Sequence, residues 1–128
     1  MATPFNLTDQ VVTATGAIAQ EAWDALDIGN FDMIDVQLDL VALAGSGPSV
    51  SIQLEGSMQN SSSDNTNWVL VGSASAPTWS GLGSSQVGFQ PVVIINMGLL
   101  RYLRWHITSL TGTSVSFTIR GMGRRYGS

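Results

Sequence analysis

The sequence predicts an all-β protein, an antiparallel, jelly-roll-like β-sandwich with about eight strands. The sequence does not determine the strand order, so an immunoglobulin-like sandwich stays the alternative. Three observations predict this fold. Apolar and polar residues alternate with a period of two in several segments, turn-forming residues separate these segments, and most of the chain has no helical period. With 128 residues and a mass of 13.6 kDa, residues 1–128 have the size of a single domain that can bury a core without disulfides.

Alternation is clearest in four long segments. In one of them, Val36, Leu38 and Leu40 alternate with polar residues, which is typical of a strand with one buried and one solvent-facing side. β-Branched and aromatic residues are frequent in all four. The four segments are residues 33–43, 49–58, 99–108 and 113–122.

Turn signals divide the rest of the chain. Residues 45–48 (Gly-Ser-Gly-Pro) and residues 110–113 (Leu-Thr-Gly-Thr) each separate two long segments and predict two β-hairpins. Residues 60–67 and 73–86 are predicted to be long loops. Shorter strands are expected within residues 8–15, 23–28, 67–72 and 86–95.

The two ends of the chain and one internal segment leave alternatives open. Residues 1–15 are expected to form an N-terminal arm or an edge strand, and residues 123–128 a short C-terminal tail. Residues 17–26 contain strong helix formers, so a short helix is an alternative to a strand there. An arm would reach a neighbouring subunit.

Composition excludes several classes of protein. Charged residues are 11% of the chain, lysine is absent and the net charge is −4, so we expect no nucleic-acid partner. No apolar run approaches the ~18 residues that span a bilayer, so we expect no membrane partner. We also expect no signal peptide, because the N-terminus lacks a basic segment followed by a long apolar one.

Few residues could carry catalysis or hold a metal. Cysteine is absent and His106 is the sole histidine, so thiolate sites and sites with several imidazoles are excluded. We interpret His106 as a surface or subunit-contact residue in a strand. The carboxylates of Asp24, Asp27 and Asp32 could ligate calcium, but their spacing matches no known loop. We therefore expect no enzyme activity, no metal and no cofactor.

Four tryptophans raise a carbohydrate-binding module as the alternative function, because flat rings stack on sugars. Trp68 and Trp105 are expected in or beside the core, and Trp23 fits either environment. Trp79 is the best candidate for exposure, since it follows Pro77 in a predicted loop.

Charge is distributed unevenly, because every arginine follows residue 100 and most acidic residues precede residue 40. Either Arg101, Arg104 and Arg120 pair with Asp35, Gln37 or Asp39 across strands of one sheet, or the basic end of one subunit faces the acidic region of another. Runs that are apolar on both faces, such as residues 92–95, predict a homo-oligomer, with a trimer favoured. The expected subunit or ligand contacts are Trp79, Arg101, Arg104, Arg124 and Arg125.

Two parts of the sequence carry a family resemblance. One is the strand at residues 50–57 with the loop ending in Asn65-Thr66-Asn67-Trp68, and the other is Leu100-Arg101-Tyr102-Leu103-Arg104-Trp105 followed by the strand at residues 114–119. They resemble small β-sandwich structural proteins of tailed bacteriophages and prophages, over residues 33–122. Asp64-Asn65 here replaces the usual Asp-Gly, which leaves the turn intact.

The resemblance implies a non-enzymatic structural protein of a phage-like particle. Such a protein would decorate the capsid, form a head fibre or belong to the tail, with capsid or tail proteins as partners. It would be assembled in the host cytoplasm and reside in the virion. Carbohydrate-binding modules share the same layout of segments, so that alternative stays open.

Overall fold

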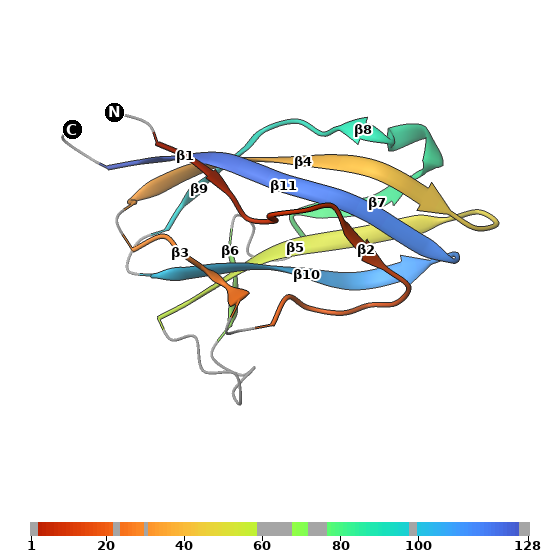
Figure 1. Ribbon diagram of the computed structural model, residues 1–128, viewed down its shortest axis with the longest axis horizontal. Helices are drawn as coiled ribbons and strands as arrows, with labels where there is room; N and C mark the ends of the chain where they lie inside the picture. Colours follow the sequence, from red (N-terminus) through yellow and green to blue (C-terminus); the bar gives the residue numbers. More distant parts are fainter. Residues whose placement is uncertain are drawn as a thin grey trace.

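The computed structural model describes residues 3–21, 24–29, 31–58, 68–71, 77–97 and 100–125, and it is an all-β sandwich (Figure 1). Within these residues, the regular structure is β-strand apart from 3-10 helix at Ser84–Gln86 and at Asp24. No helix among them is long and apolar enough to cross a membrane. The elements are β1 (Thr3–Asn6), β2 (Val12–Ala14), β3 (Leu26–Asp27), β4 (Met33–Ala44), β5 (Ser49–Ser57), β6 (Val69–Val71), β7 (Trp79–Gly83), η2 (Ser84–Gln86), β8 (Gly88–Phe89), β9 (Val93–Asn96), β10 (Tyr102–Thr111) and β11 (Ser114–Arg124).

The strands form two antiparallel sheets. The first sheet has the order β1-β11-β4-β8, with β2 also paired to β11 and β9 also paired to β4. The second sheet has the order β3-β10-β5-β6, with β7 also paired to β5. Because β1 and β2, β6 and β7, and β8 and β9 share their neighbours in this way, the described strands occupy eight positions in two sheets. This strand order is that of a jelly roll, and it decides between the jelly-roll and immunoglobulin-like arrangements that the sequence leaves open.

The core lies between the sheets and is built by the alternation of the long strands. In β4, Ile34, Val36, Leu38 and Leu40 are fully buried while the residues between them are partly exposed. The inward residues of β5, β10 and β11 complete the core, and they include Val50, Ile52, Leu54, Leu103, Trp105, Ile107, Val115, Phe117 and Ile119. Trp105 packs edge-on against Phe117 across the sandwich, with ring centroids 5.2 Å apart.

The two predicted hairpins are wrong, because the consecutive strands enter opposite sheets. β4 pairs with β11 and β5 pairs with β10, so residues 45–48 and 112–113 connect the sheets instead of closing hairpins. The two turns lie against each other at one end of the molecule (Figure 1). There the backbone N–H of Thr113 donates to the carbonyl of Ala44 (2.8 Å). Gly45 and Gly112 both have positive φ, which lets the backbones approach this closely.

The N-terminal region lines the edges of both sheets. β1 and β2 both pair with β11, so they occupy an edge of the first sheet. The helix considered for residues 17–26 is not formed in the described residues. Ala19 makes a β-bridge to His106, and Leu26 and Asp27 pair with β10, because backbone hydrogen bonds to β10 outweigh weak local helix propensity.

Two further predictions of local structure are corrected. Residues 79–83 form β7 against β5 instead of a loop, because Trp79 and Leu82 are drawn into the core. Gly123 and Arg124 continue β11 instead of starting a tail. Trp23, Asp64 and residues 126–128 lie outside the described residues.

Candidate functional site

A buried ionic cluster lies on the outer face of the second sheet. Neighbouring strands β5 and β10 place Glu55 opposite Arg104. The Arg104 Nε–H donates to Glu55 Oε1 (2.8 Å), and the second carboxylate oxygen is 2.8 Å from Nδ1 of His106 and accepts from Gln53 Nε2 (2.6 Å). The Glu55 and Arg104 side chains are only 8% and 5% exposed.

The charge of Glu55 is stabilised by its partners. Burial raises the pKa of the Glu55 carboxyl, but hydrogen bonds from His106, Gln53 and Arg104 lower it by more. The net result is a pKa below the ordinary value, so the carboxylate is ionised at neutral pH. These contacts fix the position of the buried carboxylate. They also link β5 to β10 through their side chains.

Arg104 links this cluster to two other segments. Its guanidinium lies 4.5 Å from the centroid of the Trp68 ring, within cation–π distance. It also donates to the carbonyl of Gln20 (3.3 Å). Gln20 is itself buried, and its amide contacts the backbone of Leu7, Asp24 and Trp105. The cluster therefore helps to hold residues 18–20 along the edge of β10, where they form backbone hydrogen bonds with Trp105 and Ile107.

The residues expected to make subunit or ligand contacts do not form one site. Arg101 pairs with Asp27 at the surface (3.1 Å), Arg104 pairs with Glu55, and Arg124 pairs with Asp35. Arg104 belongs to β10 of the second sheet and Arg101 directly precedes that strand, whereas Arg124 ends β11 of the first sheet and the exposed Arg125 follows it. Arg101, Arg104 and Arg124 therefore pair within their own chain, but the first two pair with Asp27 and Glu55 and not with the expected Asp35, Gln37 or Asp39.

The expected exposure of Trp79 is wrong. Its side chain is buried in β7, where it lies opposite Ile52, and the residue is only 5% exposed. Trp68 and Trp105 are buried, as predicted. Sequence alternation did not reveal the burial of Trp79 because β7 is short and interrupted by glycines.

Among the described residues, no group of three or more histidine or acidic side chains is placed to hold a metal. Of the three aspartates considered as calcium ligands, Asp27 is paired with Arg101. This pairing lowers the pKa of Asp27 through the hydrogen bond from Arg101, and a hydrogen bond from the Gly29 backbone adds to it.

One flank of the sandwich carries no charge. The sequence has no charged residue or histidine between Asp64 and Arg101, and this stretch supplies β6, β7, β8 and β9. These strands occupy the edges of both sheets on one side, because β4 lies beside β8 and β9 while β5 lies beside β6 and β7. We call this side the uncharged flank.

The uncharged flank exposes large apolar side chains. Phe89 and Ile94 are 65% and 63% exposed, although each lies opposite an aspartate of β4, Asp39 and Asp35 respectively. The other exposed apolar residues of the flank are Val69, Val87 and Val92. Edge strands usually carry charged residues that prevent pairing with other chains, and β8 and β9 lack them. An apolar edge of this kind is typical of an interaction surface.

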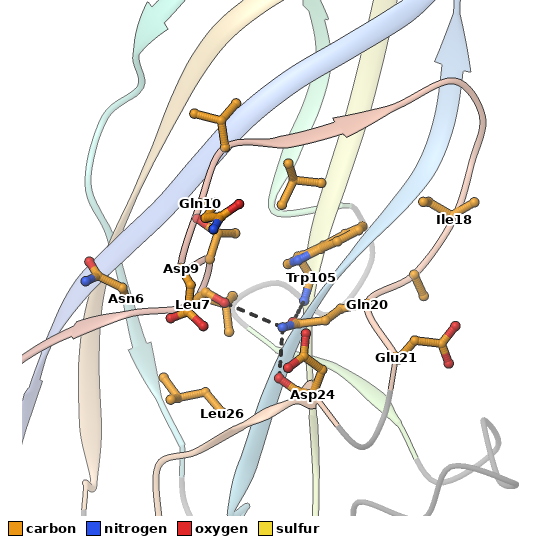
Figure 2. A pocket seen from close by; sticks show the side chains of 14 residues that line it. Asn6, Leu7, Asp9, Gln10, Ile18, Gln20, Glu21, Asp24, Leu26 and Trp105 are labelled. Carbon is orange, nitrogen blue, oxygen red and sulfur yellow. Dashed lines mark hydrogen bonds between the residues drawn. The ribbon is translucent and has the colours of Figure 1, made fainter.

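A groove of about 570 Å³ lies on the opposite flank, between residues 6–12 on one side and residues 18–21, 24 and 26 on the other (Figure 2). Trp105 and Leu26 form apolar parts of its wall, and Gln20 crosses it with hydrogen bonds to Leu7 and Asp24. Asp9 and Asp24 bring carboxylates to opposite sides of the groove, and Glu21 also lines it, on the side away from Asp9 (Figure 2).

Comparison with known proteins supports the fold. No protein-family model matches the sequence, and no curated protein matches it. A similar solved structure is the crystal structure of the SPBc2 prophage-derived protein YomS. It superposes with a TM-score of 0.53 and 17% sequence identity, over 96% of this chain and 94% of that one. The chain is thus similar, over nearly its whole length, to the fold of a prophage-derived protein.

Proposed function

We propose that the protein is a non-enzymatic structural component of a phage-like particle, which assembles as a homo-oligomer and attaches to the capsid or tail. The observation that carries this proposal is the uncharged flank, with Phe89 and Ile94 largely exposed on edge strands. The similarity of fold to a prophage-derived protein supports the phage origin.

The charge distribution favours a second copy of the chain as the partner that covers the uncharged flank. The chain has a net charge of −4, so two copies repel each other at most surfaces. Two uncharged flanks can approach with less of that repulsion, since the nearest acidic residues are Asp35 and Asp39 of the neighbouring strand β4. Such contact removes Phe89, Val92 and Ile94 from water, at roughly 25 cal/mol per Å² of apolar surface buried. Closed symmetric assembly through one surface is the common form of homo-oligomer.

The mass of the protein in solution tests this proposal. Light scattering after size-exclusion chromatography should give a discrete oligomer whose proportion rises with concentration. The double variant Phe89→Thr/Ile94→Thr should shift it to monomer, since threonine keeps strand propensity while removing apolar surface. The matched control Ile18→Thr changes a similarly exposed residue on the other flank and should retain the oligomer. A monomeric wild-type chain at high concentration would contradict self-assembly in solution.

A further inference from the structure

The groove on the opposite flank has the features of a peptide site. We propose that it binds an extended, basic segment of a partner protein. In this arrangement the indole N–H of Trp105 donates to a backbone carbonyl of the segment, and Asp9 and Asp24 pair with its cationic side chains. Because the groove and the uncharged flank lie at opposite edges of the sheets, binding here does not depend on self-association.

Trp105 supplies a directed hydrogen-bond donor. The residue is 6% exposed, and its ring is fixed by the edge-on contact with Phe117. The hydrogen bonds it makes to described residues use its backbone N–H and carbonyl, both to Gln20. The indole nitrogen faces the side of the groove formed by residues 7–10 (Figure 2). Unlike the indole nitrogens of Trp68 and Trp79, which are buried without a partner among the described residues, that of Trp105 can be reached from the groove. A peptide carbonyl in the groove can therefore accept a hydrogen bond from it.

The two carboxylates supply the charge preference. Asp9 and Asp24 line the groove, and no arginine of the described residues forms an ion pair with either. Arg101, Arg104 and Arg124 are instead engaged by Asp27, Glu55 and Asp35. Arg120 lies beside Asp9 in an adjoining hollow but does not line the groove, so the charged side chains that line the groove are acidic and favour cations from another molecule.

The shape of the groove favours a chain segment over a small ligand. It runs between the edge of the first sheet at β1 and β2 and the edge of the second sheet at β3 and Ala19. Extended peptides commonly bind along exposed sheet edges, where backbone groups and side-chain pockets are both available. A volume of about 570 Å³ is within the ordinary range for a binding pocket.

Calorimetry with two synthetic peptides tests the proposal on the intact protein at low salt. The first probe is an acetylated and amidated hexapeptide of alternating Arg and Val, and the second replaces each Arg by Glu. We expect saturable binding of the Arg-Val peptide with one site per chain, and no binding of the Glu-Val peptide. Asp9→Asn/Asp24→Asn should weaken binding about tenfold, as expected for two exposed ion pairs.

Two further variants separate this site from general attraction to an acidic protein. Trp105→Phe keeps a ring against Phe117 but removes the indole N–H, so it should weaken binding about fivefold, the value of one hydrogen bond. Asp39→Asn removes a charge from the outer face of the first sheet and should leave binding unchanged. Absence of saturable binding, equal binding of both peptides, or equal weakening by Asp39→Asn and the groove double variant would overturn the proposal. Circular dichroism tests whether each variant is folded. If Trp105→Phe does not fold, the aspartate variants alone decide the outcome.

Discussion

Arg104 and Glu55 form a buried ion pair across β10 and β5, with Nε 2.8 Å from Oε1. Both side chains face outward from the second sheet, yet both are almost fully enclosed. Removing one partner leaves the other charge buried without compensation. We therefore expect Glu55→Gln, which keeps the side-chain shape, to lower the free energy of unfolding by about 3–5 kcal/mol. Urea denaturation followed by tryptophan fluorescence measures this change.

The surface ion pair between Arg101 and Asp27 provides the control. Its side chains are about half exposed, so solvent screens the interaction. Asp27→Asn should change the free energy of unfolding far less than Glu55→Gln does. Equal effects of the two substitutions would mean that burial does not determine the strength of these pairs.

Acid should destabilise the protein through Glu55. The pKa of this carboxyl is lower in the folded chain than its ordinary value of 4.5, so the unfolded chain takes up a proton first as the pH falls. The stabilisation is therefore complete above the ordinary pKa and is lost as the pH drops through the folded-state pKa. Urea denaturation of the wild type across this range should show the loss. In Glu55→Gln the dependence on pH should be shallower, and an identical pH profile would rule out Glu55 as its source.

The turns between the sheets should tolerate substitution unequally. A Cβ on Gly112 would lie 2.7 Å from the carbonyl oxygen of Ala44, and the φ of Gly112 is +118°. Gly112→Ala should therefore lower the free energy of unfolding by about 1–3 kcal/mol, because it adds both backbone strain and a steric clash. Gly47 has a φ of +57° and open space around it, so Gly47→Ala should cost less, about 1 kcal/mol. Thermal unfolding of the two variants should rank them in this order, and the reverse order would contradict the close approach of the turns.

The faces of the strands could be predicted from the sequence, but their partners could not. Alternation is a local property, so the inward positions of Val36, Leu38 and Leu40 follow directly from it. The partner of a strand depends on which sheet the chain enters after the next turn. The same short turn at residues 45–48 can close a hairpin or lead into the opposite sheet, and the sequence near it does not distinguish the two.

The candidate surfaces were predicted less well than the fold. Apolar residues on both faces of residues 92–95 did point to the uncharged flank, where Ile95 is buried and Ile94 exposed. The sequence signal that defines the flank more fully is the absence of charge between Asp64 and Arg101. The groove could not be predicted, because Asp9, Asp24 and Trp105 come together only through the pairing of distant segments.

Cysteine accessibility tests the central claim, that the uncharged flank is the surface between subunits. The natural chain has no cysteine, so Ile94→Cys and Ile18→Cys each introduce a single thiol, one on each flank. The rate of thiol modification should fall with rising protein concentration for Ile94→Cys and stay constant for Ile18→Cys. A constant rate for Ile94→Cys, at concentrations where light scattering shows an oligomer, would contradict the claim.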